Sequence, residues 1–237
     1  MNVDLTGQTA VVTGASRGIG LAVTRALAAS GAHVVAGALH SSAELGKLAA
    51  EGSVTIGELD LAAPGGPADL VALAGTRIDI LVNNVGGAPP RTSGFLAITD
   101  EEWLATLNLN LMAAVRASRA VLPAMLSAGR GAIVNICSVN SVLSDPAVMD
   151  YSAAKAALAS FSKALSKEVG PKGVRVNTVS PGPVATDLWL GASGVAATVG
   201  QATGARPEDV VLPRAGQRLQ RADVGLAERL HRIGAAG

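Results

Sequence analysis

The sequence predicts an α/β fold, a doubly wound parallel sheet with helices on both faces. Two observations carry this prediction. Short apolar runs alternate with longer segments of helical periodicity, which is the pattern of consecutive β–α–β units. The short runs are also apolar at nearly every position, as strands become when helices cover a parallel sheet on both sides.

Six short runs rich in Val, Ile, Leu and Ala are predicted strands. They span residues 8–13, 33–36, 53–56, 78–82, 132–136 and 174–179. We expect them to be parallel, because helical segments separate most of them and allow the chain to cross over between strands. No further β-branched run follows residue 211, so we expect the seventh strand common in such folds to be missing.

Five segments between these runs are predicted helices. They span residues 19–30, 42–50, 68–74, 99–127 and 151–169. Gly31 and Gly129 follow two of them and suit helix ends, since glycine readily adopts the backbone conformation that closes a helix. Thr99 precedes three acidic residues and is expected to cap its helix, whose dipole favours negative charge in the first turn.

The composition excludes several classes of protein. The 237 residues are 2% aromatic with a formal net charge of +1, so the clustered basic residues and stacking aromatics of nucleic-acid binding are lacking. Cys137 is the sole cysteine and the three histidines lack ligand spacing, so we expect no disulfide and no metal. With no signal peptide and no membrane-length apolar run, we expect a cytoplasmic protein without a membrane partner.

A glycine-rich turn joins the first predicted strand to the first helix. Residues 13–20 read Thr-Gly-Ala-Ser-Arg-Gly-Ile-Gly. Gly14, Gly18 and Gly20 allow a tight turn, close approach of a ligand to the backbone, and close helix–strand packing. The N–H groups at the helix start attract a pyrophosphate. Many such patterns are simple turns, but the strand before this one and the helix after it favour a dinucleotide site.

A tyrosine and a lysine share one face of the last predicted helix. Tyr151 and Lys155 are four residues apart, and Tyr151 is the only tyrosine in the chain. A phenol ordinarily titrates at about pH 10, and a nearby ammonium lowers that pKa toward the range useful for acid–base catalysis. The same spacing is common in helices where it is purely structural, so it gains weight only from its neighbours.

Two further polar residues stand where a ligand is expected. Ser138 ends the fifth strand and so lies at the carboxyl edge of the sheet, where open α/β folds bind ligands. Asn110 lies inside the helix predicted over 99–127, an unfavourable position for asparagine unless a polar role holds it there. A buried amide at that point could bind a water or a backbone carbonyl and extend a proton relay.

The candidate residues follow a defined order along the chain. In sequence they are the glycine-rich run 13–20, Asn83-Asn84-Val85-Gly86, Asn110, Ser138, Tyr151-x-x-x-Lys155 and Pro181-Gly182. This ordered set resembles the short-chain dehydrogenase/reductase family over residues 5–211. The resemblance implies a Rossmann-type fold and an oxidoreductase that transfers hydride between a nicotinamide cofactor and a carbonyl or alcohol carbon. Val85 replaces the alanine usual in the family, which the site should tolerate.

The resemblance assigns roles to the matching residues. Tyr151 would be the general acid/base, and Lys155 would hold the nicotinamide ribose and lower the tyrosine pKa. Ser138 would bind the carbonyl oxygen, Asn110 would hold a relay water, and Asp60 would meet the adenine. The residues implied to bind cofactor are Gly14, Ser16, Arg17, Gly18, Ile19, Gly20, Asp60, Leu61, Asn84, Val85, Gly86, Tyr151, Lys155, Pro181, Gly182, Val184 and Thr186.

The expected cofactor is NADP(H) rather than NAD(H). NAD enzymes place a carboxylate after the second strand to bind the ribose hydroxyls, and Ala38 stands at that position. No carboxylate is therefore expected to repel a 2′-phosphate there. Arg17 can give it charge-assisted hydrogen bonds, and Ser41 and Ser42 can donate as well. The alternative is that Arg17 is a solvated loop residue.

A small carbonyl or alcohol compound is the expected substrate. The residues expected to line its pocket are Pro89, Pro90, Val139, Asn140, Met149 and 187–200, the last of which should form a lid. The resemblance suggests 3-oxoacyl thioesters, ketones or polyketide-like compounds as substrates, and the sequence does not choose among them. The resemblance also implies a homo-oligomer, a tetramer or a dimer.

The end of the chain departs from the family pattern. We expect a dinucleotide-binding and catalytic domain over residues 1–211 and an atypical Arg-, Ala- and Gly-rich tail over residues 212–237. Such a tail could arise from GC-rich DNA translated in a shifted frame, which resequencing the gene would test. If the tail is native, an alternative is a catalytically impaired nucleotide-binding protein. The intact acid–base set favours the enzyme, since a pure binding protein needs no such tyrosine.

Overall fold

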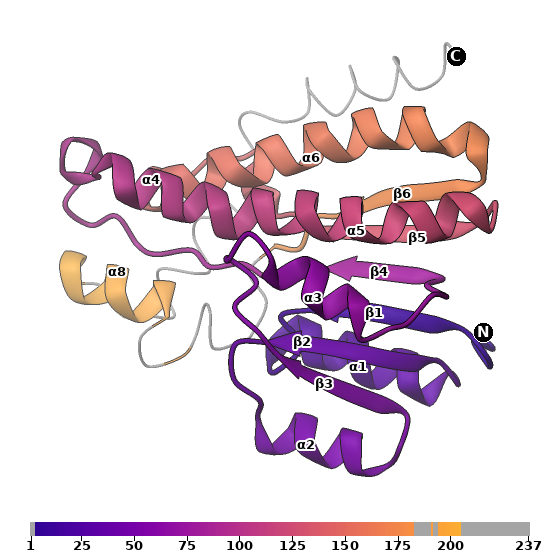
Figure 1. Cartoon of the computed structure of the whole chain (residues 1–237). Helices are drawn as coiled ribbons and strands as arrows, with labels where there is room; N and C mark the ends of the chain where they lie inside the picture. The colour runs from indigo at the N-terminus through magenta and orange to yellow at the C-terminus, as the bar shows by residue number, and fades with distance from the viewer. Residues whose placement is uncertain (1–2, 183–190, 192–193, 205–237) are drawn as a thin grey trace. The chain divides into compact units, whose positions relative to one another are not determined.

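Six parallel strands form one sheet in the order β3-β2-β1-β4-β5-β6 (Figure 1). They are β1 (Thr9–Thr13), β2 (His33–Ala38), β3 (Val54–Glu58), β4 (Ile80–Asn83), β5 (Gly131–Ile136) and β6 (Val174–Val179). All six were predicted from the sequence, and the predicted fold class is confirmed. Because β1 neighbours β4 instead of continuing outward, the order reverses direction between these two strands, where ligand crevices form in open α/β sheets.

The computed structural model describes residues 3–182, 191 and 194–204. The chain divides into two units, residues 1–181 and residues 182–237. The second unit contributes α8 (Val195–Thr203), which is followed by Gly204 in the left-handed conformation. Residues 187–190 and 192–193 of the predicted lid lie outside the described residues, and so does the whole predicted tail, residues 212–237. The domain boundary at 211 therefore remains a prediction.

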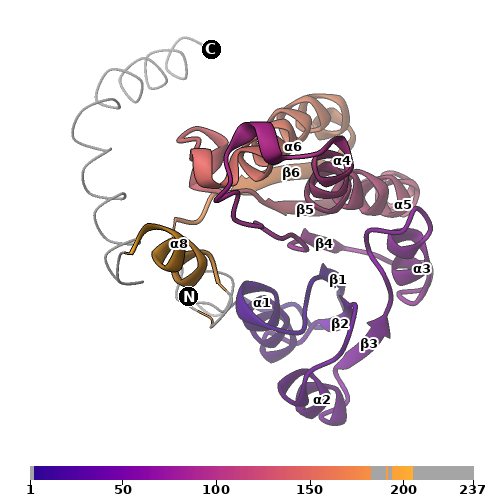
Figure 2. The same ribbon diagram turned by 90° about the vertical axis from the view of Figure 1, so that its left-hand side faces the viewer.

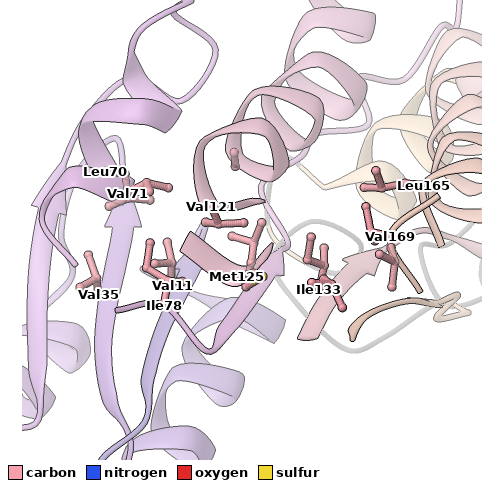
Figure 3. Close-up of a cluster of buried hydrophobic side chains, with 14 of the residues drawn as sticks. Val11, Val35, Leu70, Val71, Ile78, Val121, Met125, Ile133, Leu165 and Val169 are labelled. Carbon is pink, nitrogen blue, oxygen red and sulfur yellow. The ribbon is translucent and has the colours of Figure 1, made fainter. Parts of the chain in front are cut away.

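Helices cover both faces of the sheet in the first unit (Figure 2). One face packs on α1 (Gly18–Ala29) and α2 (Ala43–Ala50), and the other on α3 (Gly66–Ala72), α5 (Ala113–Ser127) and α6 (Met149–Val169). Strand residues alternate between the two cores, so Val11 points to the face of α3, α5 and α6 (Figure 3), and Ala10 and Val12 to the opposite one. Nearly continuous apolar strands are the result.

The helix predicted over 99–127 is interrupted. It comprises α4 (Asp100–Leu107), a π-helical turn over Asn108–Met112 and α5. Thr99 caps α4 as predicted, in a reciprocal box with Glu102 at 3.3 and 3.0 Å. The π-turn and the short 3-10 turns Phe95–Ala97, Val139–Ser141, Pro146–Val148 and Gly170–Lys172 were not predicted, because segments of three to five residues are too short to give an apolar period.

Two buried asparagines face each other across neighbouring strands. Asn83 of β4 pairs in register with Asn135 of β5, and the Asn83 Nδ2 donates to Asn135 Oδ1 at 2.8 Å. The Asn83 amide also donates to Ser118 of α5 at 3.2 Å, and Asn135 donates to Ser162 of α6 at 2.7 Å. These bonds tie both strands to the two helices above them.

Among the described residues, no helix is both long and apolar enough to cross a membrane. Within the same part of the chain, no cluster of His, Cys, Asp and Glu side chains could hold a metal ion.

We predict that Leu70→Ala lowers the free energy of unfolding by about 2–5 kcal/mol. Leu70 of α3 is fully buried over Gly37 of β2 and Gly57 of β3, two glycines that leave room for its methyl groups. The matched control is Leu73→Ala, because Leu73 is 49% exposed, and its loss should be under about 1 kcal/mol. Urea unfolding measures both, and equal losses would contradict the packing assigned to Leu70.

Candidate active site

The carboxyl ends of β1 and β4 are joined by a side-chain clamp. The Thr13 hydroxyl accepts hydrogen bonds from the backbone N–H groups of Asn84 and Val85, at 2.9 and 3.1 Å. In return, the Asn84 amide donates to the carbonyl oxygens of Thr13 and Gly14, at 3.1 and 3.0 Å. The glycine-rich turn and the segment after β4 are therefore fixed to each other. The sequence alone did not indicate this role for Thr13.

The glycines of the turn are needed where they stand. Gly14 has a φ of 68°, and a side chain there would lie 2.9 Å from the Val85 Cα atom. A Cβ at Gly20 would overlap the Gly14 carbonyl oxygen, so α1 packs directly on the turn. Arg17 is exposed at the start of α1, and no side chain caps the helix. The turn therefore offers its N–H groups and one cation to a phosphate.

Tyr151, Ser138 and Lys155 are brought together as predicted. All three are buried, and the Ser138 hydroxyl acts to lower the pKa of Tyr151. The Lys155 Nζ lies 5.7 Å from the centre of the Tyr151 ring and donates to the Ile136 carbonyl at 2.8 Å. The backbone N–H of Asn140 donates to the Ser138 hydroxyl at 3.1 Å and fixes it at the end of β5.

The expected lowering of the tyrosine pKa is wrong for this structure. Burial raises the pKa of Tyr151, and the hydrogen bond with Ser138 offsets this only in part. Burial also lowers the pKa of Lys155 to about 8. The ammonium bonds to a backbone carbonyl rather than to the phenol, so its charge does not overcome desolvation of the ring hydroxyl. The tyrosine is a protonated donor at neutral pH.

Asn110 lies in the π-turn and is buried, and its amide bonds to the backbone. It donates to the carbonyls of Gly87 and Thr106 at 2.9 and 3.0 Å and accepts from the Gly87 N–H at 3.2 Å. A Cβ at Gly86 would lie 2.6 Å from the Asn110 Oδ1 and 3.4 Å from the Lys155 Nζ. Gly86 therefore lets the segment after β4 pass between Asn110 and the lysine.

The end of β2 lies beside a carboxylate that the sequence did not indicate. Ala38 pairs in register with Glu58 of β3, and the Glu58 carboxylate accepts from the Ser41 N–H at 2.6 Å. The expectation that no carboxylate lies near this position is therefore wrong, because neighbouring strands end side by side. Ser42 is also partly engaged, since its hydroxyl donates to the Ser16 carbonyl at 2.6 Å and caps α2.

Asp60, Leu61 and Pro181 lie on loops that follow the carboxyl ends of β3 and β6. Asp60 and Leu61 follow β3, and the Asp60 carboxylate accepts from the Ala62 N–H at 2.9 Å. The Pro181 carbonyl accepts from the Val139 N–H at 3.0 Å, which joins the segment after β6 to the turn after Ser138. Val184 and Thr186 lie outside the described residues, as do 187–190 and 192–193 of the predicted pocket.

A family model described as short chain dehydrogenase matches residues 8–193. The chain belongs to the short-chain dehydrogenase family. A 3-oxoacyl-[acyl-carrier-protein] reductase of Synechocystis is 40% identical to this short-chain dehydrogenase over 216 residues, 87% of either chain. The reductase FabG of Escherichia coli K12 is 38% identical over 186 residues, 77% of this chain and 75% of that protein.

Solved structures agree with this assignment. A protein from Beutenbergia cavernae, provisionally described as an NAD(P)-dependent gluconate 5-dehydrogenase, was solved with NADP at low occupancy. It is 35% identical, covers 90% of each chain and superposes with a TM-score of 0.74. A short-chain dehydrogenase from Streptomyces avermitilis is 34% identical with a TM-score of 0.71, over 77% of this chain and 68% of that one. The resemblance noted in the sequence is confirmed, and this short-chain dehydrogenase is an oxidoreductase acting on CH–OH or C=O groups.

We predict that the single tyrosine of this short-chain dehydrogenase titrates at a higher pH in the folded than in the urea-unfolded chain. Burial disfavours the phenolate, whereas the unfolded side chain should titrate at about pH 10. Tyrosinate absorbance reports Tyr151 alone, because the chain has no other tyrosine. Ser138→Ala should raise the midpoint further, since it removes a bond that lowers the pKa. A folded midpoint below the unfolded one would contradict the dominant effect assigned to burial.

Proposed function

We propose that this chain is an NADP(H)-dependent reductase of carbonyl compounds, with Tyr151 as the proton donor to the substrate oxygen. The observation that carries the proposal is the buried cluster of Tyr151, Ser138 and Lys155 beside Gly86. A site built only to bind a nucleotide would need no buried phenol beside a buried serine. We propose reduction as the direction because the phenol holds its proton at neutral pH.

The residues of this chain fit a dinucleotide. Gly14 and Gly20 let the turn pack closely on the segment after β4 and on α1, and the uncapped start of α1 suits a pyrophosphate. The Lys155 ammonium uses one donor on Ile136 and keeps others for ribose hydroxyls. When bound, the cofactor supplies the hydride. The other residues that we propose to contact it are those matched to the family by their positions in the sequence.

Proton transfer follows from the environment of Tyr151. The Ser138 hydroxyl can donate to the substrate oxygen and hold it beside the phenol. As negative charge develops on that oxygen, Tyr151 gives up its proton, and the buried Lys155 ammonium favours the resulting phenolate. Because the pKa of Lys155 is about 8, this ammonium is charged at neutral pH. Asn110 holds Gly87 in place, and the relay water at this residue stays a prediction.

Two side chains pull the choice of cofactor in opposite directions. The exposed guanidinium of Arg17 favours a 2′-phosphate, whereas the Glu58 carboxylate beside Ser41 disfavours it. Arg17 carries the greater weight, because it stands at the start of α1, where the pyrophosphate is proposed to bind, and because Ala38 leaves the end of β2 without a charge of its own. The NADP in the Beutenbergia structure supports the same choice.

We propose a 3-oxoacyl thioester as the substrate class. The support comes from the relatives that are 3-oxoacyl-[acyl-carrier-protein] reductases at 38–40% identity over three quarters or more of the chain. The alternative of a catalytically impaired nucleotide-binding protein is not favoured, because Asn110, Ser138, Tyr151 and Lys155 are all buried in one place.

We propose that the expected homo-oligomer forms through an apolar groove between α5 and α6. Its lining includes Leu122, Leu126 and Phe161.

We predict that the purified chain oxidises NADPH when acetoacetyl-coenzyme A is added. Tyr151→Phe should lose at least about 100-fold in kcat, because the proton donor is removed while the ring is kept. Its NADPH affinity, measured by fluorescence, should stay within about twofold of the wild type. Wild-type NADPH binding without turnover on acetoacetyl-coenzyme A or simple ketones would favour the binding protein instead.

We predict that Arg17→Gln weakens NADPH binding about tenfold and leaves NADH binding unchanged, since it removes a charge-assisted bond to the 2′-phosphate. Arg25→Gln is the matched control, because Arg25 is likewise exposed but lies further along, inside α1. Fluorescence titration with both nucleotides gives the ratio of affinities. An equal loss for NADH and NADPH would assign Arg17 to the shared part of the dinucleotide.

A further inference from the structure

A buried ion pair stands immediately before the candidate tyrosine. Asp150 is fully buried in the first turn of α6, and its Oδ2 atom accepts from Arg91 Nε and Nη2 at 3.1 and 2.6 Å. The same oxygen accepts from the Thr106 hydroxyl at 2.7 Å. The other carboxylate oxygen accepts from the backbone N–H of Tyr151 at 3.0 Å. The carboxylate is therefore bonded both to the loop after β4 and to Tyr151.

The pair is charged. Burial acts to raise the pKa of Asp150, but hydrogen bonds from Arg91, Thr106 and the Tyr151 N–H, with the arginine charge, outweigh it and leave the pKa below its ordinary value. The hydrogen bond with Asp150 raises the pKa of Arg91. Desolvating two charges costs free energy that their attraction often fails to exceed, so a buried ion pair is a poor device for stability alone. Such a pair is better suited to holding the segments that carry Arg91 and Asp150 in a single relative position.

The bonds of this pair close a ring around the site. Arg91 also donates from its backbone to the Ala147 carbonyl just before α6, at 2.7 Å, and from Nη1 to Glu102 of α4 at 2.6 Å. The carbonyl of Thr106 accepts from Asn110, which in turn holds Gly87 of the loop that carries Arg91. The ring therefore joins the loop, α4, the π-turn and the start of α6.

We propose that the Arg91–Asp150 pair is a positioning device for the proposed reaction, setting the start of α6 so that the Tyr151 phenol keeps a single position beside Ser138. The inference rests on the proposed function only for its effect on turnover. Neither member of the pair is given contact with substrate or cofactor. Arg91 acts through Asp150, and Asp150 acts through the backbone of Tyr151.

The chain offers a matched control at the amino ends of the strands, away from the candidate site. Asp79, just before β4, is also nine-tenths buried, and its carboxylate accepts from Arg77 at 3.0 Å and from the Thr9 N–H at 3.0 Å. It therefore has the same kinds of partner as Asp150, an arginine and a backbone N–H. Asp79 lies at the amino end of its strand, whereas Ser138 follows a carboxyl end.

The first test observes Tyr151 directly and needs no substrate. Incorporation of 3-fluorotyrosine labels one site only, since the chain has one tyrosine. We expect a single sharp fluorine resonance in the wild type and in Asp79→Asn. Arg91→Gln and Arg91→Lys should broaden or split it, because neither keeps the two-pronged bond to Asp150. If Arg91→Gln does not fold, Arg91→Lys decides. One unchanged line in the folded Arg91 variant would overturn the proposal.

The second test separates positioning from stability. With NADPH and acetoacetyl-coenzyme A, the Arg91 variants should lose about tenfold or more in kcat and keep the KM and the NADPH affinity. The isotope effect on kcat with deuterated NADPH should rise, since a misplaced donor slows the chemical step. Asp79→Asn should lower the melting temperature and leave both kinetic quantities unchanged.

The outcomes of the two tests remain distinguishable. A wild type that shows no turnover would sink the proposed function, and the fluorine line would still decide whether the pair holds Tyr151. A disturbed line with an unchanged kcat would overturn the role in turnover. A loss in kcat of the same size in Asp79→Asn would mean that the Arg91–Asp150 pair contributes only to the stability of the fold, and would overturn the proposal as well.

Discussion

The clamp between Thr13 and Asn84 is the constraint on which the site depends. Parallel strands bring their carboxyl ends to one edge, but the order of the sheet sends the chain away from β1 and β4 in opposite directions. Without a bond between them, the two departing segments would be free to separate. The threonine hydroxyl accepts two backbone N–H groups, and the asparagine amide donates to two carbonyls, so all of these polar groups are satisfied. The clamp between Thr13 and Asn84 therefore fixes the positions of the glycine-rich turn after β1 and of Gly86 after β4.

Burial then sets the chemistry of the side chains gathered at that edge. The same loss of water raises the pKa of Tyr151 and lowers the pKa of Lys155, because burial stabilises the neutral form of each side chain relative to its charged form. A phenol in such a place keeps its proton until negative charge appears close by. Because the pKa of Lys155 is about 8, the side chain is an ammonium at neutral pH and attracts that negative charge. The same buried environment therefore keeps Tyr151 protonated as a donor and places beside it the Lys155 ammonium, which stabilises the phenolate that forms when the proton is given up.

The sequence predicted the sheet, its helices and the main site residues because apolar periods and strand ends are local properties. What it missed depends on contacts between distant segments. Glu58 reaches Ser41 only because β2 and β3 pair in one register, and Asp150 meets Arg91 across 59 residues. The interruption at Asn110 also escaped prediction, although an asparagine inside an apolar helix was a sign of a polar role. The direction of the Tyr151 pKa was wrong because spacing indicates a neighbouring charge but not the extent of burial.

The facing amides of Asn83 and Asn135 bear on how the sheet assembles. Strands made of Val, Ile, Ala and Leu resemble one another, so apolar packing alone distinguishes poorly between two alignments shifted by two residues. With β4 and β5 misaligned by that amount, each amide would face an aliphatic side chain and stay buried without its partner, at a cost of about 1–3 kcal/mol for each lost group. The pair therefore acts as an alignment mark in the middle of the sheet. It gives folding fidelity to two strands whose ends must meet correctly for Ser138 and Asn84 to lie at the same edge.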